Sequence, residues 1–167
     1  MDFVDIVLNN NNEFLEKVKK LGFKKIVLMQ NGELFDPYSK NHFTLSVYST
    51  GNYISAIRKG SAQAIFGLYA NKVILNPGLC KKLKESGIFV VFDFKSLIRS
   101  KNYFDAYKLY LKNSTLCDEH GVDALFVSAA ENVNEIKSPI QLVSFALEFG
   151  YKYQNFRRAS KRFISML

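Results

Sequence analysis

Short apolar runs alternate with polar stretches of a dozen residues or more along most of this chain. The runs are of strand length and predict β-strands at residues 3–8, 25–29, 44–48, 62–66, 88–93 and 123–127. The run at 88–93 is apolar on both faces, which is typical of a buried parallel strand. Residues 73–75 could form either a short strand or a buried loop, and the pattern does not decide between them.

Helical spacing of apolar residues fills most of the stretches between these runs. It predicts helices at residues 14–21, 53–59, 77–83, 103–119, 139–149 and 154–166. Start and stop residues support several of them, because Asn76-Pro77 and Ser138-Pro139 are favourable helix starts. Gly22, Gly87 and Gly150 stand where a helix would end.

The spacing of the strands indicates an α/β fold. A hairpin needs only two to five residues between strands, so the longer gaps favour parallel strands joined by helical crossovers. We expect one domain, 1–167, built as a small or incomplete TIM-barrel-like (β/α) barrel of six or seven parallel strands with two C-terminal helices. An open doubly wound sheet is the alternative. Residues 30–43 lack a helical period, so this crossover is expected to be irregular.

The composition is that of a globular protein with a basic surface. Lys and Arg number 23 against 15 Asp and Glu, a net charge of +8, which favours polyanionic partners, above all nucleic acid. The alternative is a basic surface without a specific partner. No apolar run is long enough to span a membrane, and Asp2 and Asp5 occupy the place of a cationic signal region. We therefore expect a cytoplasmic protein with no membrane partner.

Groups for chemistry or metal binding are few. In the predicted fold, catalytic groups would follow the strands, at Asn9, Gln30, Ser49, Gly67, Asp93 and Ser128. Of these, Asp93 alone ionises, and it has no partner in the sequence pattern. His42 falls in a loop, and His120 suits a helix C-terminus. Cys80 and Cys117 are expected to be buried and reduced, with a disulfide or a reactive thiol as the alternative. We do not expect the chain to be catalytic alone or to bind a metal.

Two groups of cations are the candidates for contact with a partner. The last predicted helix carries an apolar stripe on one side and four cations on the other, with two lysines shortly before it: Arg157, Arg158, Lys161, Arg162, Lys137 and Lys152. Lys95 and Arg99 follow the strand at 88–93, on the edge that would also hold the Ser128 loop. We expect both groups to contact RNA or a protein partner, and charge reversal at Arg158 and Arg162 to weaken RNA binding without unfolding the chain. A solvated helix face is the alternative.

The stretch from the last strand into the next helix resembles a known family. Its residues are Ser128-Ala129-Ala130-Glu131 followed by Glu135-Ile136-Lys137-Ser138-Pro139. The pattern resembles ribonuclease P protein component 3 of archaea and eukaryotes, a family with a TIM-barrel-like fold. The likeness continues through 57–66, 76–78 and 87–94. The chain departs from the family at Gln141, where an acidic residue is common, and about one βα unit is missing or shortened between Met29 and Thr44.

The resemblance implies a subunit of the ribonucleoprotein that removes the 5′ leader from precursor tRNA. The catalyst would be the RNA with its Mg²⁺, and this chain would bind no cofactor of its own. Its partners would be that RNA, ribonuclease P protein component 2 and other protein subunits, with precursor tRNA contacted indirectly. Ser128 and Ala129 would shape a turn, Lys137 would contact a phosphate or carboxylate, and Pro139 would start a helix. The alternatives are a barrel enzyme of the metal-dependent phosphoesterase kind and a scaffold whose basic helix docks an acidic protein.

Overall fold

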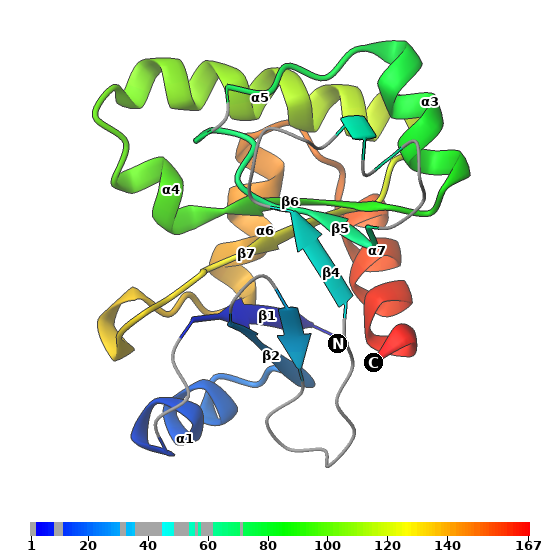
Figure 1. Ribbon diagram of the computed structural model, residues 1–167. Coiled ribbons are helices and arrows are strands. Elements are labelled where there is room, and N and C mark those ends of the chain that lie inside the picture. Colours follow the sequence, from blue (N-terminus) through cyan, green and yellow to red (C-terminus); the bar gives the residue numbers. More distant parts are fainter. Residues whose placement is uncertain are drawn as a thin grey trace.

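The computed structural model describes residues 3–8, 12–30, 33–35, 45–48, 54–55, 57, 62–70 and 72–167. The strands are β1 (Val4–Val7), β2 (Lys25–Gln30), β3 (Glu33–Phe35), β4 (Leu45–Tyr48), β5 (Ala64–Ile65), β6 (Phe89–Asp93) and β7 (Ala124–Val127). The helices are α1 (Asn12–Lys20), α3 (Pro77–Glu85), α4 (Phe94–Ile98), α5 (Tyr103–His120), α6 (Pro139–Glu148) and α7 (Tyr153–Met166), with a short 3-10 turn η1 (Val133–Glu135). Figure 1 shows their arrangement.

All seven strands belong to one sheet, in the order in which they occur in the chain. The α/β class is confirmed, and six of the strands run in the same direction. The prediction of parallel strands throughout is wrong at β3, which pairs antiparallel with β2 and with β4. Only residues 31 and 32 separate β2 from β3, which is the length of a hairpin loop. A short hairpin therefore stands at the start of the stretch where an irregular crossover was expected.

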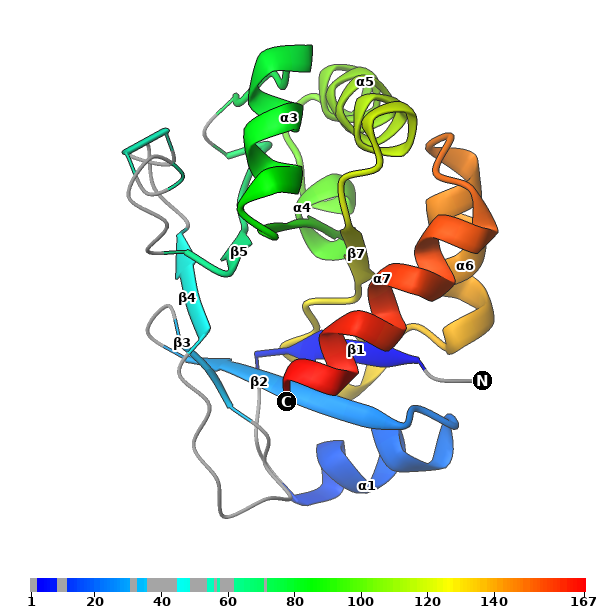
Figure 2. The ribbon, with the colours of Figure 1, turned by 90° about the vertical axis from the view of Figure 1, so that its right-hand side faces the viewer.

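The sheet curls until its first and last strands meet. The N–H of Ala129 donates to the carbonyl of Ile6 at 3.0 Å, and the N–H of Leu8 donates to the carbonyl of Ala130 at 2.8 Å. These bonds join β1 to the residues that follow β7. In Figure 2, α1, α3, α5 and α6 lie outside the curled sheet, and α7 crosses near β1 and β7.

The two faces of the sheet bury two separate apolar clusters. The larger one lies between the sheet and the outer helices and takes Phe92 and Phe126 from neighbouring strands. The smaller one takes the alternate strand residues, including Val91 and Leu125, together with Ala159 and Phe163 of α7. The ring of Phe163 packs edge-on against Phe89 at 5.2 Å between centroids. Strand alternation places these residues on opposite faces, and α7 covers the inner cluster.

Most predicted helices are confirmed, with ends that differ by a few residues. Asn76 caps the N-terminus of α3, and Gly22, Gly87 and Gly150 adopt positive φ at or near helix ends. The five-residue helix α4 was not predicted, because it is too short to show a period. Most of the helix predicted at 53–59 lies outside the described residues, as does His42.

Residues 73–75 form a loop rather than a strand. The buried side chain of Asn113 holds this loop, since it accepts from the N–H of Leu75 at 2.9 Å and donates to the carbonyl of Val73 at 2.8 Å. Cys80 and Cys117 are both free and buried, as expected. Within the described part of the chain, no helix has the length and apolarity needed to cross a membrane.

Candidate nucleic-acid interface

The turn after β7 is tied to the first strand by a buried carboxyl group. Asp5 accepts from the backbone N–H of Ser128 at 2.8 Å and from the Ser128 hydroxyl. Both residues are at most 1% exposed. Ala129 then adopts a left-handed backbone conformation with φ 50°, which sends the chain from the strand into the loop. The Ser128-Ala129-Ala130 turn therefore fastens the two edge strands of the sheet to each other.

The environment of Asp5 favours its neutral form. Complete burial raises the pKa of this carboxyl to about 7, although the hydrogen bonds from Ser128 act in the opposite direction. Removing a carboxylate from water is costly unless a cation compensates, and the contacts of Asp5 come from neutral donors. The bond between Asp5 and Ser128 is therefore sensitive to protonation near neutral pH.

The loop after β7 carries two carboxylates that face the cations of α4 and its C-terminus. Lys95 forms an ion pair with Glu131, and Arg99 bridges Glu131 and Glu135. The Lys95 ammonium lowers the pKa of Glu131. Burial by itself would raise the pKa of Glu135. The N–H of Glu131 and the Arg99 guanidinium outweigh burial, so the pKa of Glu135 is lowered. The expectation that Lys95 and Arg99 share an edge with the Ser128 loop is confirmed by these contacts.

The remaining residues of the family-like motif start α6. The ammonium of Lys137 lies 4.6 Å from the centre of the Phe94 ring, a cation–π contact. Ser138 caps α6 and Pro139 occupies its first turn. The side chain of Gln141 accepts from the Ser138 N–H at 2.8 Å, while the Gln141 N–H donates back to the Ser138 hydroxyl. Gln141 thus completes a capping box, a role that a Glu also fills.

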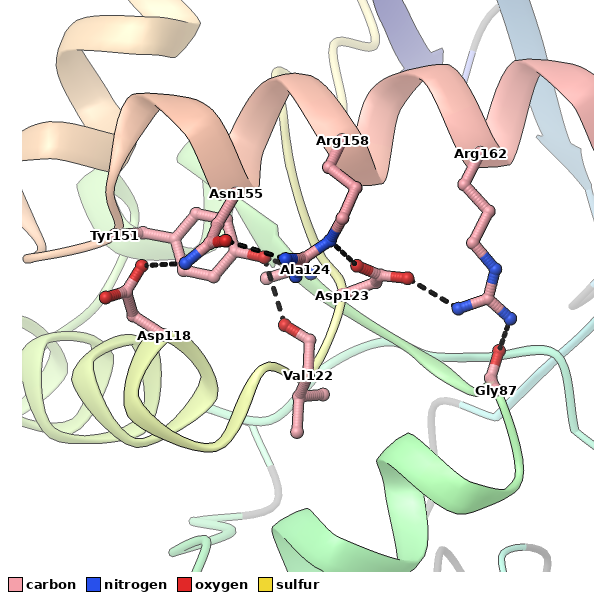
Figure 3. A network of polar contacts seen from close by, with 9 residues as sticks. All are labelled: Gly87, Asp118, Val122, Asp123, Ala124, Tyr151, Asn155, Arg158 and Arg162. Carbon is pink, nitrogen blue, oxygen red and sulfur yellow. Dashed lines mark hydrogen bonds and ion pairs between the residues drawn. The ribbon is translucent and has the colours of Figure 1, made fainter.

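The cations of α7 divide into two kinds. Arg158 and Arg162 both bind the carboxylate of Asp123, which is 8% exposed (Figure 3). Arg162 also donates to the carbonyl of Gly87 at 3.2 Å and lies over the Phe89 ring at 5.1 Å. These two arginines join α7 to the residues just before β6 and β7. Their charge is used within the fold.

A second set of contacts holds the start of α7. Asp118 accepts from the backbone N–H of Lys152 at 2.9 Å and from the Asn155 amide at 2.6 Å, and its second oxygen pairs with the Lys152 ammonium at 3.1 Å (Figure 3 shows the Asn155 contact). Partial burial by itself would raise the pKa of Asp118, but these donors outweigh it and lower the pKa. The fully buried Tyr151 hydroxyl donates to the carbonyl of Val122 and accepts from the N–H of Ala124, each at 3.0 Å.

Arg157 and Lys161 are the other two cations of α7, and they face solvent. Both line a shallow pocket of about 390 Å³ together with Tyr153, Gln154 and Arg158. Neither has a hydrogen bond or ion pair with the described residues. Arg157 and Lys161 are therefore the members of the basic helix whose charge is available to a partner.

The structure places the predicted cations at opposite ends of the sheet, and it groups Lys137 with Lys95 and Arg99 rather than with the last helix as expected, because its ammonium lies over the Phe94 ring of α4. Lys95, Arg99 and Lys137 follow the carboxyl ends of β6 and β7, whereas Arg158 and Arg162 bind residues that precede the same strands. Strands of four and five residues separate the two ends by roughly 15 Å. In Figure 1, α4 and the loop after β7 lie at the left and α7 at the right. We call them the carboxyl-end surface (Lys95, Arg99, Lys137) and the amino-end surface (Lys152, Arg157, Arg158, Lys161, Arg162).

The one ionisable candidate for catalysis has a structural role. Asp93 caps α4 by accepting from the N–H of Ser96 at 2.6 Å, and it also accepts from the Tyr110 hydroxyl at 3.3 Å. Burial raises its pKa despite these bonds. His120 is the last residue of α5, as expected. Among the described residues there is no cluster of three His, Cys, Asp or Glu side chains that could hold a metal ion.

Sequence reasoning missed the acidic residues that organise both ends. Asp5 interrupts an apolar strand, and Asp123 stands at the start of another, so each is visible in the sequence as a charge within or beside an apolar run. That signal predicts a partner for the charge but does not identify it. Ser128 lies 123 residues from Asp5, and Arg162 lies 39 residues from Asp123.

The fold and its two basic ends define a curled α/β sheet protein with cations at both ends of its strands. No protein-family model and no curated protein matches the sequence. The structure is similar to a chain in a cryo-EM structure of archaeal ribonuclease P with mature tRNA, with a TM-score of 0.73 at 13% identity. The match covers 95% of this chain and 88% of that chain. At this identity the likeness establishes a shared fold, which agrees with the resemblance noted from the sequence.

Proposed function

We propose that this chain is a protein subunit of ribonuclease P, the ribonucleoprotein that removes the 5′ leader from precursor tRNA. The fold shared over 95% of the chain with a chain of archaeal ribonuclease P carries the proposal. The sequence motif from Ser128 to Pro139 and the net charge of +8 support it independently of the fold. The chain is active as part of this complex, in which the RNA is the catalyst.

The cations provide the physical basis for the role. A folded RNA brings phosphates together, and cations placed between them reduce the repulsion and release counterions. Such contacts position the RNA without reading its sequence. Arg157 and Lys161 of the amino-end surface suit this task, because they carry charge that the fold does not use. Two surfaces about 15 Å apart would allow the chain to contact two separate segments of one RNA, or RNA at one end and a protein at the other.

Four finer points belong to the same proposal. The curled sheet is a reduced β/α barrel in which the β2–β3 hairpin replaces one βα unit. Ribonuclease P protein component 2 is the neighbouring protein subunit. Mg²⁺ acts with the catalytic RNA, and this chain binds no cofactor. The complex works in the cytoplasm as an endonuclease that hydrolyses a phosphodiester bond.

Reconstitution tests the proposal directly. The catalytic RNA, component 2 and the other protein subunits from the same source are combined with precursor tRNA, with and without this chain. We expect the complete mixture to cleave the 5′ leader at a lower Mg²⁺ concentration than the mixture that lacks the chain. A mixture that contains the Arg157→Ala/Lys161→Ala variant should need a Mg²⁺ concentration between those of the complete mixture and the mixture without the chain.

Two results would contradict the proposal. Cleavage that is equally efficient with and without the chain at every Mg²⁺ concentration would show that it is not a working subunit. Cleavage of RNA by the isolated chain, abolished by Asp93→Ala, would instead favour the phosphoesterase-like enzyme. Within the described part of the chain, Asp93 caps α4, a structural role that does not favour that alternative.

A further inference from the structure

A pocket of about 430 Å³ opens beside the carboxyl-end surface. Its walls come from the turns after β5 and from α4 with the residues that follow it, so it lies beyond the carboxyl ends of two neighbouring parallel strands. This edge is the usual position for ligands in sheets of this kind. The polar residues that line the pocket include four cations and two hydroxyls: Lys72, Lys95, Arg99, Lys101, Ser96 and Ser100.

Three features set this pocket apart from a chance cluster of cations. Lys72 has a φ of 49°, a strained conformation for a residue with a side chain, and such strain concentrates at binding sites. The hydroxyl of Ser100 is buried and has no hydrogen-bond partner within the described part of the chain. Lys72 and Lys101 form no ion pair with any residue that the structure describes, so the pocket holds more positive charge than its surroundings neutralise.

The other two cations already bind oxygen anions. Lys95 and Arg99 hold the carboxylates of Glu131 and Glu135, which come from the neighbouring loop. A phosphate group offers the same kind of oxygen acceptors with a fixed charge and more of them. The guanidinium of Arg99 suits a tetrahedral anion, because its planar fork can donate two parallel hydrogen bonds. The two glutamates therefore show that Lys95 and Arg99 are placed to bind anionic oxygen atoms.

We infer that this pocket binds a phosphate group, with Lys72 and Lys101 supplying the free charge and Lys95 and Arg99 exchanging a glutamate carboxylate for a phosphate oxygen. The inference that the phosphate belongs to RNA rests on the proposed function. The inference that the pocket binds a phosphate group rests on the pocket residues alone. The phosphate is either internal to an RNA strand or at its 5′ end. Glu131 lowers the affinity, because it competes for the same cations.

Binding to the full-length isolated chain tests the inference without the rest of the complex. Amide resonances are followed by NMR during titration with inorganic phosphate, and Kd is measured for one RNA oligonucleotide with either a 5′-phosphate or a 5′-hydroxyl. The variant Lys72→Ala/Lys101→Ala removes two pocket cations. Lys108→Ala/Lys112→Ala removes two exposed cations of α5 that do not line the pocket and serves as the matched control.

We expect phosphate to shift the resonances of the pocket residues on both walls, among them Tyr69, Lys72 and Ser100. The pocket variant should weaken RNA binding at least tenfold, while the control changes it less than threefold. Glu131→Gln should tighten binding about threefold. Fivefold tighter binding of the 5′-phosphorylated strand identifies a terminal phosphate, and equal binding identifies an internal one. Equal weakening by the pocket and control variants, or no shift in these residues with phosphate and RNA, overturns the inference. The proposed function fails separately, if reconstituted cleavage does not depend on the chain while phosphate binding persists.

Discussion

The two ends of the curled sheet use positive charge in different ways. At the amino end, Arg158 and Arg162 point inward to a buried carboxylate, Asp123, and join α7 to the strands. At the carboxyl end, Lys95 and Arg99 pair with glutamates that are themselves on a surface loop. Asp123 is 8% exposed, whereas at the carboxyl end Glu131 is 49% and Glu135 16% exposed.

This difference decides which charges can be exchanged. Breaking a pair with a buried carboxylate leaves that charge without compensation, so the contact is difficult to replace. An exposed pair contributes little to stability and can give way to another anion. A count of cations in the sequence therefore overestimates how much charge the amino-end surface can offer a partner. The same count underestimates the charge that the carboxyl-end surface can offer.

The largest effect should come from reversing the inward-facing arginines. Arg158→Glu with Arg162→Glu places two carboxylates against Asp123, and we expect a loss of about 3 kcal/mol in the free energy of unfolding, the lower end for a broken buried pair because the arginines are half exposed. Denaturant unfolding measures it. The sequence-based expectation that this variant keeps its fold and tests RNA contact is replaced by a stability test.

The matched control reverses the two outward-facing cations of the same helix. Arg157→Glu with Lys161→Glu makes the same change in charge. We expect the free energy of unfolding to fall by less than about 0.5 kcal/mol. Equal losses in the two double variants would remove the distinction between inward and outward cations.

The next effect concerns the Asp5–Ser128 bond between β1 and the end of β7. Because the folded-state pKa is raised from 3.8 to about 7, the folded chain binds more protons than the unfolded chain between these values, and stability falls as pH rises. We expect this carboxyl to cost about 2 kcal/mol between pH 5 and 7. Asp5→Asn should flatten that part of the stability curve, measured by denaturant unfolding at a series of pH values.

The control for this experiment is Glu119→Gln, which removes one carboxylate from an exposed position on α5. A decline between pH 5 and 7 that is as steep in Asp5→Asn as in the unchanged chain would show that another group is responsible.

A smaller effect is expected on RNA binding by the amino-end surface. Arg157→Ala with Lys161→Ala should leave the fold intact and reduce the slope of log K against log salt by roughly 0.7 for each lost phosphate contact on single-stranded RNA. Fluorescence anisotropy at several salt concentrations measures this slope. An unchanged slope would mean that the outward-facing cations contact no phosphate.

The smallest effect concerns the start of α6. Gln141→Glu restores the acidic residue common in the resembling family, keeps the capping box and adds a negative charge near a helix N-terminus. We expect a gain of about 0.5 kcal/mol in the free energy of unfolding. Gln141→Ala, which removes the bond to the Ser138 N–H, should instead lose stability; a variant series without this order would contradict the capping role.

Secondary structure could be predicted from the sequence where residues within the element or at its ends determine it. The strand at 89–93 follows from an unbroken apolar run, and the start of α3 follows from Asn76 and Pro77. The hairpin of β2 and β3 was missed, because β3 has only three residues and residues 30–43 were expected to form an irregular crossover. The pairing of Lys95 and Arg99 with the Ser128 loop was partly predictable, since parallel strands bring their following loops to one edge.

By itself, the sequence determined the α/β class, most of the strands and helices, the excess of positive charge and the turn that resembles ribonuclease P protein component 3. Each depends on residues close together in the chain or on composition alone. Only the tertiary structure decided that Asp5 binds Ser128, that Asp123 binds Arg158 and Arg162, and that the two groups of cations lie at opposite ends of the sheet. The reason is that a buried charge indicates the need for a partner, whereas the closure of the sheet and the packing of α7 determine which distant residue reaches it.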